Sequence, residues 1–135
     1  MPDRWINVAA ARRDLLETPD IILSKIDSVL ADDELYEPGE PRPSPETVGR
    51  AKSLINAAMD RERRIPKAEV SAYFGELDVT WRHQNRLLRL VVFPDVTRRP
   101  VLYSQTDSGD ALTRGHSIEV TGSDVLSSRL DWLLA

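Results

Sequence analysis

The sequence contains no cysteine and no long hydrophobic run, and each absence excludes a class of protein. Without cysteine there is no disulfide framework, no thiolate nucleophile and no cysteine-rich zinc site. No apolar run approaches the roughly 18 to 20 residues that a membrane-spanning helix needs, and the amino-terminal residues lack the apolar stretch of a signal peptide. We therefore expect a cytoplasmic protein that does not contact a membrane.

Motifs for catalysis, nucleotide binding and metal binding are also missing. The chain has no Gly-x-Ser-x-Gly, Gly-x-x-x-x-Gly-Lys, Gly-x-Gly-x-x-Gly or His-Glu-x-x-His segment. Neither His83 nor His116 belongs to a recognised signature. Residues 107–110 offer oxygen ligands, but the further acidic ligands of a calcium loop do not follow, so an ordinary turn is favoured. We expect no enzyme, cofactor or metal; an unfamiliar catalytic site around His83, His116 or Asp110 ranks third among the functions considered.

The composition is that of an ordinary folded domain. Hydrophobic residues make up 41% of the chain and charged residues 30%, which does not favour disorder. A length of 135 residues suits a single hydrophobic core. We predict one domain over 1–135, with a helical segment at 1–31, an acidic, proline-rich linker at 32–43 and an α+β core at 44–135.

The formal net charge of −4 is unevenly distributed along the chain. Residues 1–43 carry five Lys/Arg and ten Asp/Glu, residues 44–100 carry eleven and seven, and residues 101–135 carry two and five. The middle of the chain is therefore basic and both ends are acidic. This asymmetry either marks a docking surface or reflects unevenly solvated faces, and the second explanation is the more common one.

Three helices have recognisable starts. Each start is a capping residue or glycine followed by proline, an acidic side chain or both. The acidic side chain suits the positive end of the helix dipole. The signals predict helices over 19–31, over 44–63 and from 123 to the end of the chain, and Pro66 stops the second of them. A weaker apolar pattern predicts a further helix over 4–17.

The residues between the last two helices are patterned as strands. Leu77, Val79 and Trp81 alternate with polar residues, and an apolar run at 86–93 follows the turn at 83–85. Further strands are expected at 68–73, 101–103 and 117–121. We predict an α+β fold in which the central helix packs on an antiparallel sheet of three to five strands, with amino-terminal helices and a carboxyl-terminal helix. Trp81 should lie in the core and pack against helix 44–63.

The terminal helix carries an apolar stripe that offers candidate partner contacts. The stripe consists of Leu126, Leu130, Leu133 and Leu134, with Trp132 at its edge, and the candidate contacts are Leu126, Leu130, Trp132 and Leu133. Most amphipathic helices use such a stripe to close their own core, and this explanation is favoured here. Tryptophan is enriched among interface anchors, so binding of a protein partner or of a second copy is the other explanation.

A basic face for nucleic acid is the alternative site. Its candidates are Arg82, Arg86, Arg89, Arg98 and Arg99. Together they could meet phosphate groups. Strand alternation by itself explains the hairpin arginines as the solvent side of a half-buried sheet, and this explanation is favoured. The negative net charge also argues against a dedicated nucleic-acid binder. We therefore do not favour a nucleic-acid partner.

Residues 40–93 loosely resemble a group of small uncharacterised bacterial proteins. The resemblance consists of a Pro-Ser-capped helix followed by a hairpin that contains glycine and tryptophan. The residues that carry it are 42–48, Ala51, Leu54, Ile55, Pro66, Val70, Gly75 and Trp81. Some members lie beside toxin–antitoxin or phage-related genes, so the resemblance implies an antitoxin-like, phage-associated or defence-associated binding role and no catalytic residue. We predict a non-enzymatic protein-binding or regulatory module, with a nucleic-acid-binding regulator as the alternative.

Overall fold

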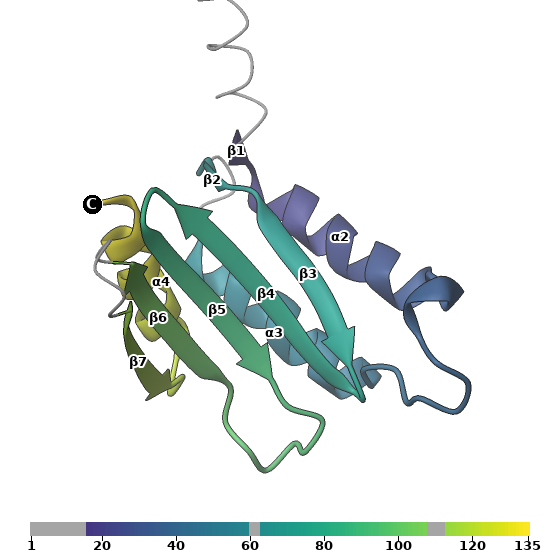
Figure 1. The fold of residues 1–135 in the computed structure, drawn as a ribbon. Coiled ribbons are helices and arrows are strands. Elements are labelled where there is room, and N and C mark those ends of the chain that lie inside the picture. The colour runs from purple at the N-terminus through teal and green to yellow at the C-terminus, as the bar shows by residue number, and fades with distance from the viewer. Residues whose placement is uncertain (1–15, 60–62, 108–112) are drawn as a thin grey trace, which may run out of the picture.

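The computed structural model describes residues 16–59, 63–107 and 113–135. Its helices are α2 (Pro19–Ala31), the short 3-10 helix η1 (Asp33–Leu35), α3 (Pro45–Ala58) and α4 (Ser123–Leu134). Its strands are β1 (Leu16–Glu17), β2 (Ile65–Pro66), β3 (Ala68–Tyr73), β4 (Glu76–His83), β5 (Arg86–Val92), β6 (Val101–Asp107) and β7 (Thr113–Glu119). Strands β3 to β7 form one antiparallel sheet in chain order, and β1 pairs with β2 (Figure 1). The predicted α+β class is confirmed.

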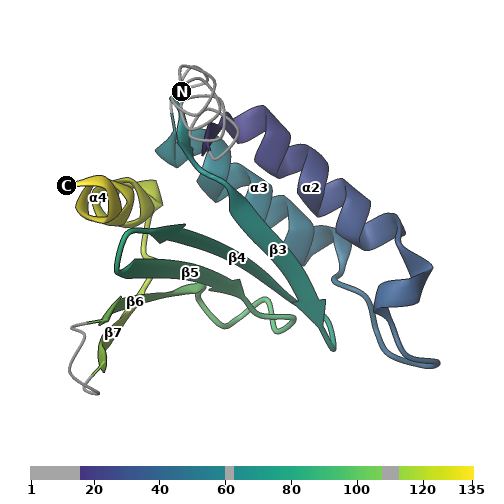
Figure 2. The same cartoon turned by 45° about the horizontal axis from the view of Figure 1, so that its top comes forward.

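The three α-helices of the described ranges pack on one face of the five-stranded sheet (Figure 2). Side chains from this face of β4 and β5 and from the three helices share a single core. Its fully buried members are Ile22, Ile26, Ala51, Ile55, Ile65, Leu77, Val79, Trp81, Leu88, Leu90, Val92, Leu102, Leu126, Leu130 and Leu133. The prediction that Trp81 lies in the core with helix α3 is therefore confirmed, because its side chain is 0% exposed.

Helix α3 begins where the sequence predicts and ends earlier. The Ser44 hydroxyl accepts a hydrogen bond from the Thr47 N–H at 3.2 Å, and proline follows the cap as the pattern required. The predicted end at residue 63 is wrong, because the helix stops at Ala58 and Met59 is extended. Met59 is buried in that conformation, so packing of its side chain into the core overrides its helix propensity.

Two further predictions at the ends of elements need correction. Residues 4–15 of the predicted first helix lie outside the described residues, while Leu16 and Glu17 form strand β1 instead of a helix end. The strand expected at 117–121 is β7, which begins and ends earlier. In both cases backbone pairing decides the conformation: β1 pairs with β2 and β7 pairs with β6. The sequence around each segment does not show where its partner strand begins and ends.

The predicted linker at 32–43 is mostly exposed, yet it is held against the end of α2. The Tyr36 hydroxyl donates to the Val29 carbonyl at 2.8 Å, and Arg42 donates from Nη1 to the Leu30 carbonyl at 2.8 Å. The Arg42 guanidinium also lies 4.6 Å from the centre of the Tyr36 ring. Burial raises the pKa of Tyr36 above its ordinary value. These contacts satisfy carbonyls at the carboxyl-terminal end of α2.

None of the helices in the described ranges lies on the other face of the sheet (Figure 2). Asp78 lies on this face, and its Oδ1 is buried without a hydrogen-bond partner among the described residues. Burial, followed by the hydrogen bond and negative charge of Glu76, raises the pKa of Asp78 to about 7, against the opposing effect of Arg89. Between about pH 4 and pH 7, Asp78 is therefore mostly protonated in the folded chain and mostly ionised in the unfolded chain.

Asp78→Asn is expected to stabilise the protein at pH 8 and to change little at pH 4. Because the folded pKa is raised, the cost of ionising Asp78 grows as pH rises from about 4 to about 7 and persists above that. Solvent screens this half-exposed side chain, so we expect a gain of about 1 to 2 kcal/mol at pH 8. Thermal unfolding of both proteins at the two pH values checks this. An equal gain at pH 4 would mean that ionisation is not the cause.

Candidate binding groove along helix α3

One flank of α3 faces away from α2 and borders a groove. The opposite flank carries Lys52, which pairs with Asp27 of α2. The cavity in the groove has a volume of about 700 Å³. Its walls are α3, the loop between β5 and β6, and the segment Val120–Gly122 that joins β7 to α4. This volume lies in the range of ligand-binding cavities.

The wall formed by α3 is lined by small side chains. Gly49, Ser53 and Ala57 recur every four residues, so they lie above one another on the same flank of the helix. All three are exposed, and the half-buried Leu54 adds an apolar surface beside them. Small side chains at this spacing leave the helix backbone open to close approach by another element.

The opposite wall is apolar and is held in place by α3. It includes Val96, which is 52% exposed, and the buried residues Pro100 and Val120. Arg50 of α3 donates from Nη1 to the Arg98 carbonyl at 2.9 Å and from Nη2 to the Phe93 carbonyl at 2.6 Å. These two bonds fix the loop relative to the helix, so the groove is preformed.

Asp95 stabilises the same loop from within. Its carboxylate accepts hydrogen bonds from the Thr97 N–H at 2.9 Å and from the Thr97 hydroxyl at 2.7 Å. These bonds lower the pKa of Asp95. The Arg98 guanidinium packs over the Phe93 ring at 3.6 Å from its centre. The loop is therefore ordered by its own contacts as well as by Arg50.

The groove has few groups that could do chemistry. Glu46 and Arg50 are the charged residues that line it, and both Nη atoms of Arg50 are occupied by backbone carbonyls. Arg50 Nε is buried without a hydrogen-bond partner among the described residues. A nucleophile paired with a base is not found among the lining residues. The arrangement suits binding of an apolar surface.

The stripe of the terminal helix lies elsewhere. Leu126, Leu130 and Leu133 are 0% exposed and belong to the core, so they offer no surface to a partner in this fold. Trp132 is half-buried, and the Arg86 guanidinium lies 5.1 Å from its ring centre. Arg86 also donates to the carbonyls of Trp132 and Ala135, the latter at 3.0 Å. The leucine stripe therefore closes the core, as the favoured explanation held.

The five candidate arginines do not form one face. Arg82 and Arg89 lie on the face without helices, whereas strand alternation places Arg86 on the helix-bearing face. Arg98 and Arg99 are in the loop after β5. Several of them contact acidic residues or hydroxyls: Arg82 lies 3.7 Å from Glu69, Arg99 lies 3.7 Å from Glu119, and Arg89 Nε donates to the Thr80 hydroxyl at 3.1 Å. The arginines that lie close together in the sequence are therefore on different surfaces of the folded chain.

The histidines are also separated. His83 ends β4 and His116 lies on β7, with β5 and β6 between them, and Asp110 lies outside the described residues. In the ranges that the structure covers, no group of three or more His, Cys, Asp or Glu could hold a metal ion. None of the helices there is long and apolar enough to span a bilayer.

A second cavity, of about 890 Å³, lies beside the β1–β2 pair. Lys25, Lys67, Arg82 and His83 line it together with Glu69. Lys25 forms an ion pair with a buried glutamate, and Arg82 lies near Glu69, so much of the positive charge is neutralised. The cavity is thus a weaker candidate for binding anions than its basic residues suggest.

The groove along α3 was not predicted from the sequence. The recurrence of Gly49, Ser53 and Ala57 on one flank was a signal that could have pointed to it. The second wall could not have been found in this way, because Val96 and Val120 come from segments on either side of β6 and β7.

No family model matches the chain, and neither a curated protein nor a solved structure is similar to it. The resemblance to small bacterial proteins therefore stays a prediction. The function has to follow from the geometry and chemistry of the chain itself, and the groove along α3 is the feature that best defines a binding site.

Proposed function

We propose that this protein is a non-enzymatic binding module whose groove along α3 receives an amphipathic helix of a protein partner. The observation that carries the proposal is an apolar groove that stays open beside a helix lined by small side chains. Helix-in-groove recognition uses such surfaces, with apolar anchors spaced three and four residues apart. The proposal includes the antitoxin-like or regulatory role that the resemblance implies.

The dimensions of the groove favour a helix as the occupant. Its α3 wall runs from Glu46 to Ala57, which corresponds to about 17 Å of helix length, or three turns. A small-molecule site of this size would normally present several converging polar groups, whereas Arg50 here is committed to the loop. Exposed Glu46 at one end of the groove is complementary to a basic residue near the end of the partner helix.

A nucleic-acid-binding role is less well supported. The arginines that would carry it lie on both faces of the sheet and in a loop, and most have contacts within the chain. A phosphate-binding surface would need these charges on one side and free to meet the backbone of the nucleic acid. Retention on DNA at about 0.15 M salt that is lost in an Arg82, Arg86 and Arg89 triple alanine variant would reverse this ranking.

Ser53→Arg is expected to weaken binding of helical peptides at least tenfold, because it puts a long charged side chain into the apolar groove. The probe is a set of 16-residue peptides selected by display against the wild-type protein, which we expect to carry apolar residues at i, i+3 or i+4, and i+7. Binding is measured by fluorescence anisotropy, and the contact surface by NMR shift changes at Gly49 and Ala57.

The matched control is Asn56→Arg, which adds the same charge to an exposed position of α3 outside the groove. This variant should bind the selected peptides as the wild type does. If both variants bind equally well, or if the shift changes lie on the helix-free face of the sheet, the groove is not the binding site.

A further inference from the structure

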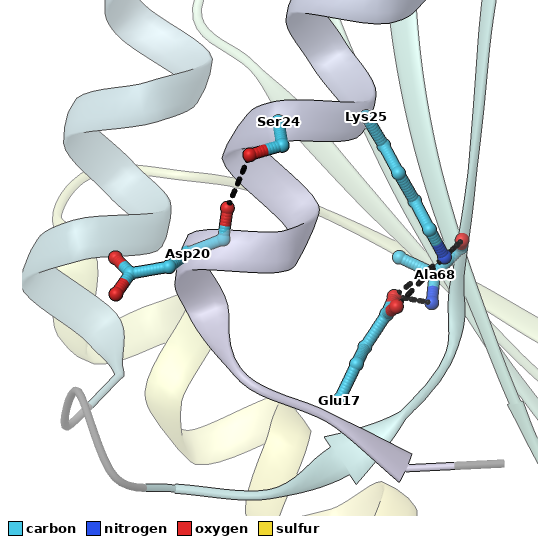
Figure 3. Close-up of polar contacts among 5 residues, drawn as sticks. All are labelled: Glu17, Asp20, Ser24, Lys25 and Ala68. Atoms are coloured by element: carbon cyan, nitrogen blue, oxygen red, sulfur yellow. Dashed lines mark hydrogen bonds and ion pairs between the residues drawn. The ribbon is translucent and has the colours of Figure 1, made fainter. Parts of the chain in front are cut away.

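The two edge strands of the five-stranded sheet, β3 and β7, differ in how their outer backbone groups are covered. At the β3 edge, side chains occupy the backbone groups of Ala68: Glu17 accepts from its N–H at 2.7 Å, and Lys25 donates to its carbonyl at 2.9 Å (Figure 3). Glu17 and Lys25 also form an ion pair at 2.8 Å, and α2 packs along β3. This clamp blocks the start of the β3 edge against pairing with another strand.

The β7 edge has no such cover among the described residues. In these ranges β7 pairs with β6 alone, and residues 115–119 are all exposed. Its sequence contains neither proline nor lysine, two residues that commonly protect sheet edges. As far as the structure describes the chain, the backbone of β7 is therefore available as a template for an added strand.

The hydrogen-bond pattern shows which backbone groups face outward. The Val120 N–H donates to the Pro100 carbonyl at 2.8 Å. These two residues lie opposite each other, one position beyond the pair Val101 and Glu119 in the β6–β7 register. In an antiparallel ladder such bonded pairs alternate along the strand, so His116 and Ile118 bond inward to β6. The outward groups belong to the alternate residues Thr113, Gly115, Ser117 and Glu119.

We propose that β7 pairs antiparallel with β7 of a second copy of the chain, about a twofold axis at His116, and joins two sheets into one of ten strands. In this register Thr113 lies opposite Glu119 and Gly115 opposite Ser117. The outward set maps onto itself, so each of these residues faces another whose N–H and carbonyl are free to bond. A closed twofold arrangement of this kind uses the same edge of both chains.

The outward residues next to the proposed axis, Gly115 and Ser117, are both small. A cavity of about 290 Å³ lies next to Gly115, between Tyr103 and Gln105 of β6 and Ser117 of β7. In the proposed register Ser117 of the second copy lies opposite Gly115, which has no side chain that could hinder it. On the helix-bearing face, Ile118 is 41% exposed and would be covered by the added strand. This pairing does not depend on the groove along α3.

Sedimentation velocity with Ser117→Pro tests the proposal. Proline removes an N–H that faces outward and leaves the bonds between β6 and β7 intact, which edge strands tolerate. The wild type should be a dimer of 15.2 kDa chains at about 100 µM, and Ser117→Pro should raise the dissociation constant at least tenfold. Ser117→Ala, which keeps the N–H, should dimerise like the wild type.

Two measurements keep the result decisive. Ser117→Lys, a second variant that keeps every backbone group, should also weaken the dimer at least tenfold if Ser117→Pro fails to fold. In the wild-type dimer, hydrogen exchange at the Gly115 amide should be slower than in Ser117→Pro and Ser117→Lys, and exchange at the amide of residue 117 should be slower than in Ser117→Lys. The proposal is overturned if the wild-type chain stays monomeric at about 100 µM, even if it binds some other strand. It is also overturned if the dimer is unchanged in both variants.

Discussion

Replacing Trp81 with alanine is expected to lower the free energy of unfolding by about 3 to 5 kcal/mol, the largest effect of any single substitution considered. The side chain is 0% exposed and lies in the core between β4 and the helices. Its removal loses the transfer free energy of an aromatic ring and leaves a cavity that close-packed neighbours fill only in part. Chemical denaturation with urea measures the change.

Two control variants separate packing from polarity. Trp81→Phe keeps most of the buried volume and removes Nε1, which has no hydrogen-bond partner in the part of the chain that the structure describes. It should therefore cost clearly less than the alanine variant. Tyr73→Ala removes an aromatic ring that is 67% exposed and should cost under about 1 kcal/mol. Equal losses in Trp81→Ala and Tyr73→Ala would contradict the core position of Trp81.

Glu17→Ala is expected to lower the free energy of unfolding by about 2 to 4 kcal/mol, because it leaves the buried Ala68 N–H without its acceptor and the Lys25 ammonium without its opposite charge. Glu17 is 3% exposed, and its carboxylate accepts from both groups (Figure 3). The effect should include local opening, since this clamp connects β1 and α2 to β3. Hydrogen exchange at Ala68 should become faster than in the wild type.

The control is Asp27→Ala, which breaks an ion pair between Lys52 of α3 and an exposed carboxylate of α2. Solvent screens that pair, so its loss should cost under about 1 kcal/mol. A Glu17 variant that is no less stable than the Asp27 variant would show that burial does not strengthen the clamp.

Local patterns in the sequence were enough for most of the secondary structure. The capping sequence at Ser44 predicted the start of α3, and the alternation through Leu77, Val79 and Trp81 predicted both a strand and the face that it buries. These predictions succeeded because a cap and a two-residue period are properties of neighbouring residues. The end of α3 was mispredicted because it depends on how the Met59 side chain packs in the core.

Features that join distant segments were not accessible in the same way. Arg86 is seven residues before Phe93 in an apolar run, and its sequence neighbours gave no indication that it binds the end of α4. Glu17 was assigned to a helix, whereas it pairs with Lys25 and reaches Ala68, a residue 51 positions later. Such contacts form only when the sheet and helices have come together.

The sequence by itself determined the α+β class, the starts of three helices and the burial of Trp81, because each follows from local capping or from the periodicity of apolar residues. The tertiary structure alone decided that the α4 leucines close the core, that the arginines are divided between faces, and that a groove remains open along α3. The physical reason is that a side chain's environment is set by what packs against it. Elements far apart in the chain provide that packing, and the order of strands in the sheet places them.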